Sequence, residues 1–388
     1  MHKLSLSKRL IPSVIFIIGA ISACIPASAQ SSHDITSLSK WGPYSKEYFG
    51  ISHIADLQSG IQVEFMLIPG QYRRNFKIPN ALFEAGVHPW QVTADMKHIT
   101  YRHDIEWKDR VYVDATWHII DEQRVLLETR CVNNTDQAQN INLQLAARKT
   151  GGTQEQWVPE MNFGKEDFIV KYPEVDLTYG VAWNYTMSEI RQFRCEKLEH
   201  LMHRKVHDHV FKNLKGDLKG HYTVNFLRPI TLKPQQDTTI LQIIACGTKE
   251  EVAGMLDEFH REGVDKTLAA KAHSSKPMEQ TCGNSEFALG QRLLQATMLT
   301  NVVYPIDCLG SPIRHFCPGK NWNSLYTWDC GFIGWTMSEI APYRGYEIIR
   351  QYTTTPEEEA PFIHHGTPLA TQILAIGDVW KNNGCDEA

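Results

Sequence analysis

The sequence predicts an N-terminal antiparallel β-sandwich followed by helical hairpins, and two observations on hydrophobic periodicity predict it. Between residues 46 and 247, apolar and polar residues alternate, which is typical of strands with one buried face. From Thr248 onward the apolar residues recur at the helical period of 3.6. A chain of 388 residues is long enough for two domains, so we expect one domain for each pattern.

Strand patterns in the first region are separated by turn-forming residues. The run Asn133-Asn134-Thr135-Asp136 is one such turn, because Asn and Asp side chains bond to their own backbone. The number of segments suits a large sandwich of antiparallel sheets over residues 46–247. Strands are predicted at 61–65, 111–117, 124–131, 141–147, 179–185, 222–226 and 238–245.

A linker helix is predicted directly after the sandwich. Thr248 and Glu251 have the spacing of a capping box, which marks the start of a helix. Polar residues between 272 and 284 then indicate a domain boundary, so the linker helix and linker occupy 248–283. The residues on the apolar stripe of this helix are Val252, Met255, Leu256 and Phe259.

The last region, residues 284–388, is predicted to be helical throughout. A first helix runs from Ser285 to Tyr304-Pro305, a second starts near Asp329, and a third surrounds 346–349. A fourth covers about 367–380. The buried side of the first helix is predicted to contain Phe287, Leu289, Leu293, Leu294 and Met298, and that of the fourth Leu369, Ile373, Leu374, Ile376 and Val379.

The N-terminus predicts an exported protein. Basic residues precede an apolar run from Leu10 to Ala23, and a small-residue cleavage site ends at Ala29, so residues 1–29 read as a signal peptide. The run ending at Cys24 also resembles a bacterial lipobox, which would make Cys24 a lipid-anchored N-terminus. Both alternatives predict a periplasmic or outer-membrane-associated protein.

Charge and cysteines exclude several classes. The net charge of −5 falls to −8 without the leader residues Lys3, Lys8 and Arg9, which argues against a nucleic-acid partner. None of the eight later cysteines forms a C-x-x-C pair, so zinc-ribbon and thioredoxin motifs are absent. A Cys308–Cys317 disulfide and buried free thiols remain open alternatives.

No cofactor or metal is predicted. Four histidines between His200 and His209 invite a metal interpretation, but no acidic or Cys ligand completes the set, and we expect an exposed basic segment. The sequence also lacks a Walker loop, a dinucleotide-binding glycine-rich turn and a G-x-S-x-G motif, which leaves nucleotide and serine-hydrolase chemistry without support.

The segment from Trp322 to Ile340 is the candidate site. Here Trp322, Tyr326, Trp328 and Trp335 surround one carboxylate, Asp329. An acid enclosed by indole rings loses hydration, which favours its protonated form and suits a proton donor in glycosidic bond cleavage. Alternatively, the indoles are core residues at helical spacing and Asp329 is a first-turn acid favoured by the helix dipole.

These residues carry a family resemblance. Phe316, Pro318, the run 325–329, Gly331 and Phe332 resemble the Phe-x-Pro and Trp-Asp-x-Gly-Phe motifs of glycoside hydrolase family 63, the processing α-glucosidases and their bacterial relatives. The resemblance implies an inverting hydrolase of α-glucosides or related oligosaccharides, in which a β-sandwich precedes an (α/α)6 barrel. It makes Asp329 the general acid.

The substrate contacts are predicted from residue chemistry rather than from the resemblance. The spacing between the two motif parts is longer here than in the eukaryotic members, so the loop that carries Trp322 is not transferred from the family. The expected partner is an oligosaccharide or glycan. The predicted substrate-binding residues are the stacking rings Trp322, Tyr326, Trp328 and Phe332, with His364 and His365 as hydroxyl contacts.

The predicted barrel is larger than the remaining sequence. Twelve helices with their connections need about 200 residues, and residues 284–388 number only 105. We therefore expect a fragment of a longer enzyme, inactive by itself, whose general base is a Glu beyond Ala388. The acids Glu357, Glu358 and Glu359 are expected to be a solvated face.

Three other functions fit the same pattern. Another (α/α)6 hydrolase, of the trehalase or rhamnosidase type, differs only in pocket chemistry. A polysaccharide lyase also combines a helical toroid with sheets, but usually places its helices first. A non-catalytic carbohydrate-binding protein accounts for the aromatic residues without a second carboxylate.

Overall fold

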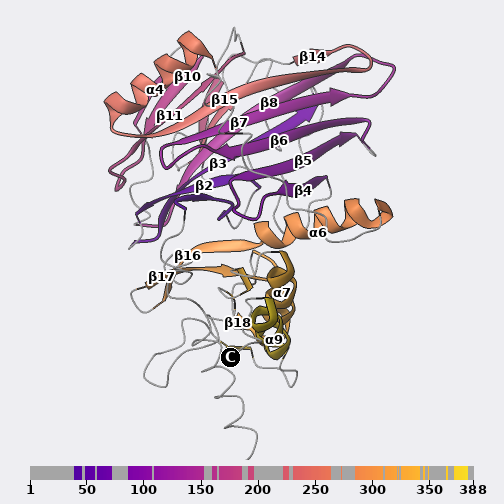
Figure 1. Ribbon diagram of the computed structural model, residues 1–388. Coiled ribbons are helices and arrows are strands. Elements are labelled where there is room, and N and C mark those ends of the chain that lie inside the picture. Colours follow the sequence, from indigo (N-terminus) through magenta and orange to yellow (C-terminus); the bar gives the residue numbers. More distant parts are fainter. Residues whose placement is uncertain are drawn as a thin grey trace, which may run out of the picture. The chain divides into compact units, whose positions relative to one another are not determined.

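The structure of the protein is a computed structural model, and two antiparallel sheets are the largest elements among its described residues (Figure 1). The described residues are 39–45, 49–56, 59–71, 86–106, 109–152, 160–163, 166–185, 191–195, 222–226, 230–263, 272, 285–308, 311–320, 322, 325–340, 344–345, 348, 364–365 and 371–382.

Sheet A has seven strands and sheet B has eight, which confirms the sandwich-like, mostly β class. Sheet A runs in the order β1 (Trp41–Gly42), β2 (Ile51–Asp56), β3 (Ile61–Gln71), β8 (Gln139–Thr150), β13 (Tyr222–Phe226), β12 (Arg191–Cys195), and β14 (Ile230–Leu232) also pairs with β8. Sheet B runs β4 (Val87–Val92), β5 (His98–Glu106), β6 (Val111–Ile119), β7 (Arg124–Asn133), β15 (Gln236–Gly247), β11 (Thr178–Trp183), β10 (Asp167–Lys171), β9 (Glu160–Phe163).

All seven predicted strand segments are confirmed. The segment 222–226 coincides with β13, and five others lie in β3, β6, β7, β8 and β15. The segment 179–185 overlaps β11, which ends two residues earlier, at Trp183. The turn after β7 forms as predicted, because the buried Asn133 side chain accepts from the Thr135 backbone N–H and donates to the Gln137 and Lys233 carbonyls.

The two sheets pack face to face through an aromatic core. His53 on β2 hydrogen-bonds to the Tyr179 hydroxyl on β11 at 2.8 Å, and the rings of Phe65 and Tyr179 lie 5.9 Å apart. Burial lowers the pKa of His53 to about 3 and raises that of the neighbouring Cys246 thiol to about 12. Both groups are therefore neutral core residues.

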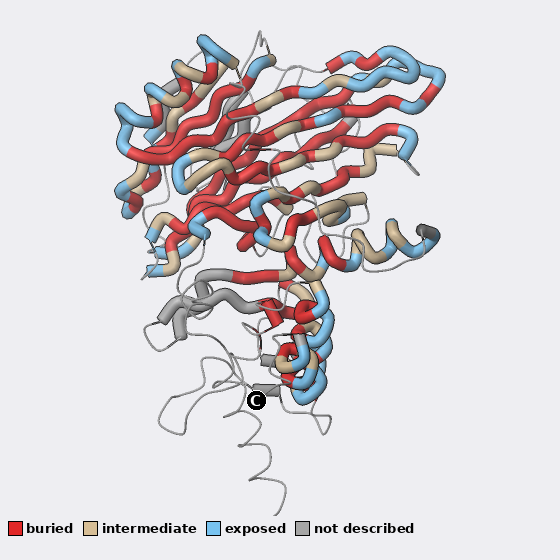
Figure 2. Tube along the Cα trace, viewed as in Figure 1, coloured by how far each residue is buried: buried red, intermediate tan, exposed pale blue. Residues whose placement is uncertain are grey.

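The helix predicted after Thr248 is present as α4 (Lys249–Glu262), and it covers part of the outer face of sheet B (Figures 1 and 2). Both halves of the capping box form between Thr248 and Glu251. A Cβ on Gly180 of β11 would lie 2.4 Å from Val252, so the glycine allows the helix to approach the strand closely. The core beneath α4 contains Ala182, Ile243, Ala245, Val252, Leu256 and Phe259.

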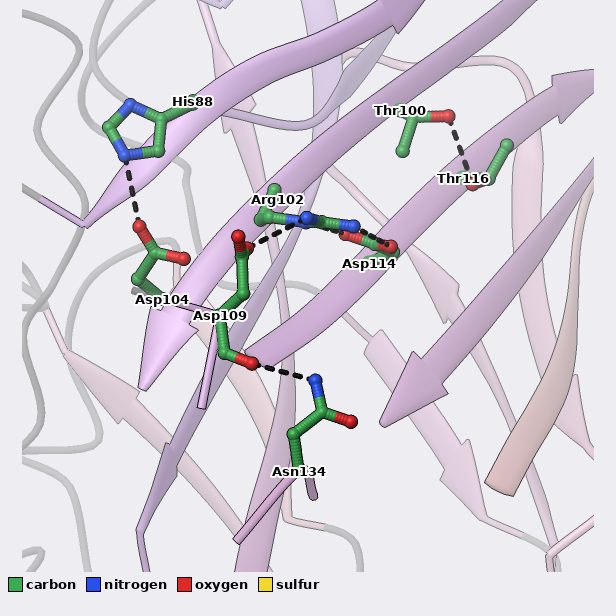
Figure 3. Close-up of polar contacts among 8 residues, drawn as sticks. All are labelled: His88, Thr100, Arg102, Asp104, Asp109, Asp114, Thr116 and Asn134. Atoms are coloured by element: carbon green, nitrogen blue, oxygen red, sulfur yellow. Dashed lines mark hydrogen bonds and ion pairs between the residues drawn. The ribbon is translucent and has the colours of Figure 1, made fainter. Parts of the chain in front are cut away.

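Beyond α4, the outer face of sheet B carries a polar ladder (Figure 3). Arg102 donates two hydrogen bonds to Asp114 on the neighbouring strand and one to Asp109 in the β5–β6 turn. Its guanidinium carbon lies 3.7 Å from the Trp90 ring centroid and 4.0 Å from that of Tyr112. The cation is therefore held by both charge and aromatic contact.

The first long helix forms, but the prediction of its buried side was wrong. It consists of a short 3-10 turn, η2 (Ser285–Phe287), followed by α6 (Ala288–Thr300). Phe287, Leu289 and Leu294 are exposed. The helix packs along the edge strand β4, where Arg292 lies 5.1 Å from the Trp90 ring, and this single neighbour selects a different face. The buried residues are Gln295, Ala296, Leu299 and Thr300.

The prediction that the region after residue 284 is helical throughout was wrong. After α6 the chain forms a two-stranded sheet of β16 (Val302–Cys308) and β17 (Ser311–Phe316). The β-branched pair Val302-Val303 favours a strand, and Pro305 cannot continue a helix. Cys131, Cys246 and Cys317 are buried and in no disulfide, so the Cys308–Cys317 disulfide is not formed.

The chain divides into two compact units. We call residues 39–314 with 319–322 the sandwich unit, and residues 315–318 with the described residues from 325 onward the helical unit. The helical unit contains β18 (Leu325–Tyr326), α7 (Thr327–Ile340), β19 (His364–His365) and α9 (Gln372–Asn382).

The fourth predicted helix is α9, and its buried face was only partly predicted. Ile376 and Val379 are buried as expected, together with Ala375. Ile373 and Leu374 are exposed, because α9 packs on α7 and the buried face of the helix is formed by Ala375, Ile376 and Val379. The third predicted helix is described only at residues 344–345 and 348, where Ile348 is buried.

Several predictions fall outside the described residues. The signal peptide, Cys24, the histidines at 200–209, Leu369 and the acids at 357–359 all do so. In the part of the chain that the structure describes, no helix combines the length and apolar character needed to cross a bilayer.

Candidate functional site

The Phe-x-Pro part of the motif has a structural role before α7. The Phe316 ring is fully buried at the end of β17, and the buried Arg344 guanidinium lies 6.0 Å from its centroid. This contact is a cation–π interaction between two parts of the helical unit. The Phe of the motif therefore anchors the chain that leads toward the Trp-Asp segment.

The motif glycine has a packing role in α7. A Cβ on Gly331 would lie 2.1 Å from the Thr371 hydroxyl and 2.5 Å from the Gln372 backbone nitrogen, so only glycine allows α7 and α9 to approach this closely. The Thr371 hydroxyl donates to the Trp328 carbonyl at 2.8 Å. This bond occupies a carbonyl in the first turn of α7 and fixes its position against α9.

Asp329 lies in the first turn of α7 and is exposed. The sequence predicted an acid enclosed by indole rings, and the described residues do not enclose it. The helix buries its glycine face against α9, which turns the adjacent positions outward. The alternative placement, an acid in the first turn where the helix dipole favours negative charge, matches the structure.

An aromatic row runs along the exposed side of α7. Trp328, Phe332 and Trp335 are spaced four and three residues apart, and their exposed fractions are 47, 40 and 37%. Successive ring centroids lie 6.4 and 6.3 Å apart. Monomeric proteins seldom expose a contiguous row of large apolar rings unless that surface binds a ligand or a partner. Trp335 was not among the predicted contacts, although its i, i+3 relation to Phe332 was visible in the sequence.

Two predicted histidines are brought beside the start of α7. His364 and His365 form β19, which pairs in parallel with β18, so that His365 is opposite Tyr326 and His364 opposite Leu325. Tyr326 directly precedes α7 and is partly buried. The histidine pair, nearly forty positions further along the chain, therefore lies beside Tyr326, which is three residues before Asp329.

Trp322 belongs to the other compact unit. It is exposed at 56%, and it belongs to the sandwich unit rather than to the helical unit that contains Asp329. Its backbone N–H donates to the Gly319 carbonyl at 2.7 Å within a short turn. Of the predicted site residues, the helical unit thus gathers six: Tyr326, Trp328, Asp329, Phe332, His364 and His365.

This arrangement offers apolar faces beside one carboxyl group. Aromatic rings stack on the C–H faces of sugars through apolar contact, and a carboxyl group beside them can bond to a hydroxyl or donate a proton. Among the described residues, no group of three or more His, Cys, Asp and Glu side chains is placed to hold a metal ion.

Comparison with known proteins finds distant structural similarity. No family model matches the sequence, and no curated protein matches it. A family GH92 glycosyl hydrolase superposes with a TM-score of 0.30 at 7% identity, over 94% of this chain and 56% of that one. The GH92 α-mannosidase of Bacteroides thetaiotaomicron gives 0.27 at 9% identity, over 68% and 32%.

Other similar structures act on carbohydrates by different chemistry. A putative kojibiose phosphorylase from the human microbiome has a TM-score of 0.25 at 8% identity, over 76% of this chain and 28% of that one. Heparan sulfate lyase from Pedobacter heparinus has 0.25 at 8% identity, over 54% and 31%. This chain spans 28 to 66% of the length of such structures. All these similarities are distant, and the assignments below rest on the residues of this chain.

Proposed function

We propose that the protein is a glycoside hydrolase that acts on α-glucosides or related oligosaccharides. The observation that carries the proposal is the Trp-Asp-x-Gly-Phe motif at the start of α7, where the exposed Asp329 carboxyl adjoins the row of exposed rings that begins at Trp328. The packing of Gly331 against α9 supports the proposal, because the motif glycine then fixes the position of the helix that carries Asp329.

Asp329 acts as the general acid in this proposal. Its proton passes to the glycosidic oxygen as the bond between that oxygen and the anomeric carbon breaks. Because Asp329 is exposed, the bound sugar itself has to exclude water from the carboxyl group. In an inverting mechanism a second carboxylate, roughly 6.5 to 9.5 Å away, takes a proton from the attacking water.

The substrate contacts follow from the same placement. Trp328 and Phe332 provide stacking faces, while Tyr326, His364 and His365 supply polar groups at the β18–β19 pair. Trp322 contributes only when the sandwich unit takes part in binding. The helices α7 and α9 are proposed to be the first members of an (α/α)6 barrel.

Hydrolysis of reducing α-linked glucose disaccharides by an enzyme form long enough to include the second carboxylate tests the proposal, with proton NMR recording which anomer appears first. We expect the β-anomer, because inversion at an α-linkage produces it. Initial release of the α-anomer would contradict the inverting mechanism. A trehalase-type or rhamnosidase-type enzyme would instead cleave trehalose or α-rhamnosides.

A second candidate is a non-catalytic carbohydrate-binding protein. The exposure of Asp329 favours it, because a binding surface needs no desolvated acid. Glycan binding that depends on Trp328, with no hydrolysis of any bound glycan, would support this candidate over the hydrolase. Release of an unsaturated sugar that absorbs ultraviolet light would instead identify a lyase.

Export to the periplasm or outer membrane is a further part of the proposal, supported only by the leader sequence. Mass spectrometry of the mature N-terminus separates its two forms. An N-terminus at Gln30 identifies signal-peptide cleavage, and a diacylated or triacylated Cys24 identifies the lipoprotein.

A further inference from the structure

One face of sheet A is buried although it faces away from sheet B. Phe65 and His53 point into the sandwich, since both contact Tyr179 of sheet B. Side chains alternate along a strand, so Ser52 and Glu64 lie on the opposite face. In a two-layer sandwich that face is usually solvated and polar. Here Ser52 is fully buried and Glu64 is only 3% exposed.

The strand register places a row of polar side chains on this outer face. Glu64 pairs with Ser52 on β2 and with Arg148 on β8, so these three side chains share one face. Four and six residues further along β3, Ile68 pairs with Gln144 and Gly70 with Asn142, and these positions are on the same face. We call Ser52, Glu64, Asn142, Gln144 and Arg148 the polar row of sheet A.

The charged members of the polar row neutralise each other. Arg148 Nε donates to Glu64 Oε2 at 2.5 Å, and both side chains are at most 5% exposed. A buried ion pair of this kind leaves no net charge on the surface around it. A ligand of this face is therefore expected to be neutral.

The uncharged members retain hydrogen-bonding capacity. Within the described part of the chain, neither the nitrogen nor the oxygen of the fully buried Gln144 amide has a hydrogen-bond partner, and the same holds for Asn142 Oδ1 and Ser52 Oγ. Buried polar atoms in native proteins nearly always have a partner, because an unpaired one costs free energy. Four unpaired atoms in one row on one face indicate a ligand that supplies the missing bonds.

We propose that the polar row of sheet A is a binding site for a neutral polyhydroxylated ligand, a sugar. Neighbouring hydroxyls of a sugar both donate and accept, which matches the Gln144 amide, while Asn142 Oδ1 accepts. Met66, Ile68 and Ala146 lie on the same face and offer apolar contact for C–H groups. Because Gln144 is fully buried, binding requires this face to open.

This site is separate from the α7 motif and does not rest on the proposed hydrolase. All its residues belong to the sandwich unit, whereas Asp329 belongs to the helical unit. The exposed rings of α7 could bind the same sugars, so the experiment has to separate the two sites. Asp329→Asn and Trp328→Ala change only the helical unit and should leave binding at the polar row unchanged.

The test measures thermal stability and sugar binding in the same variants. Gln144→Leu replaces the unpaired amide by an apolar group of similar size, so we expect Tm to rise by roughly 2 to 4 °C. Calorimetric titration of Trp328→Ala and of Trp328→Ala/Gln144→Leu with a panel of neutral mono- and oligosaccharides should show binding weaker by about tenfold or more in the double variant. Sulfated and carboxylated oligosaccharides serve as the charged comparison.

Gln242→Leu is the matched control. The Gln242 amide is also fully buried with both polar atoms unpaired, but its neighbours in the register, Leu127 and Trp183, place it inside the sandwich. We expect the same rise in Tm, with binding unchanged. A lower Tm in Gln144→Leu, equal loss of binding in Gln242→Leu, preference for the charged sugars, or no binding of any neutral sugar would each overturn the proposal.

Discussion

The two sheets bury their large rings, whereas helix α7 displays them. Trp117 and Trp183 in the sandwich are at most 1% exposed, while Trp328 and Trp335 on α7 are 37% exposed or more. Strands in a two-sheet core have neighbours on several sides, and α7 has α9 as its main described neighbour. The rings of the sheets therefore stabilise the sandwich core, whereas those of α7 remain accessible.

The largest expected effect concerns the buried charge pair of the sandwich. Glu64→Gln leaves the buried Arg148 without its carboxylate, which should cost about 3 to 5 kcal/mol of unfolding free energy. Denaturant unfolding followed by tryptophan fluorescence measures it. Glu262→Gln removes a carboxylate from an exposed pair with Arg261 and should change the free energy by less than about 1 kcal/mol. Equal effects would show that the buried pair is solvated.

In the helical unit the largest effect is expected at the motif glycine. Gly331→Ala places a methyl group against Thr371 and the Gln372 backbone, and overpacking of this kind costs about 1 to 3 kcal/mol. Gly254→Ala on the solvent side of α4 meets no atom within 4 Å and should instead add up to about 1 kcal/mol. Thermal unfolding of both variants decides the point, and a stabilising Gly331→Ala would refute the close contact of α7 with α9.

Acid should destabilise the sandwich through its buried histidines. Burial lowers the pKa of His53 to about 3, against about 6.5 in the unfolded chain, so the unfolded state binds the proton first as pH falls. Stability is then complete above pH 6.5 and decreases toward pH 3, by about 2 kcal/mol at pH 5. His53→Gln should reduce this slope. An unchanged slope in His53→Gln would contradict the burial of a neutral imidazole.

A smaller effect is expected at the start of α4. Thr248→Ala removes the side-chain cap from the Glu251 backbone N–H and should cost about 1 kcal/mol. Thr248→Ser keeps the hydroxyl and should recover most of this loss. The comparison of these two variants by thermal unfolding distinguishes the cap from simple loss of side-chain volume, since a Ser variant as weak as the Ala variant would exclude the cap.

The sequence was informative where one local pattern determines the structure. The period of two located β13, and the Thr248–Glu251 spacing located α4, because both signals depend only on near neighbours. The buried faces of α6 and α9 were predicted incorrectly or in part, because each helix packs on a partner that periodicity does not identify. Residues such as Leu294 and Ile373 are apolar yet exposed, so composition alone cannot select the face.

The candidate site shows the same division. The motif located Asp329, Trp328 and Phe332 at the start of one helix, and β19 brought His364 and His365 to the same place. The sequence did not predict the exposure of Asp329, because two Trp residues seven positions apart have the same spacing on a buried side and on a solvent-facing side of a helix. The packing role of Gly331 depends on Thr371, forty residues away, and needed the structure.

The kinetics of Asp329→Asn test the central claim most directly. In the enzyme form that includes the second carboxylate, initial rates are measured on a reducing α-linked glucose disaccharide and on α-glucosyl fluoride, whose leaving group needs little protonation. The exposed Glu339→Gln on the same helix is the control. We predict a loss of about 10² to 10⁴-fold in kcat on the disaccharide, a much smaller loss on the fluoride, and no loss in the control. Equal disaccharide turnover by Asp329→Asn and by the unaltered protein would contradict the account.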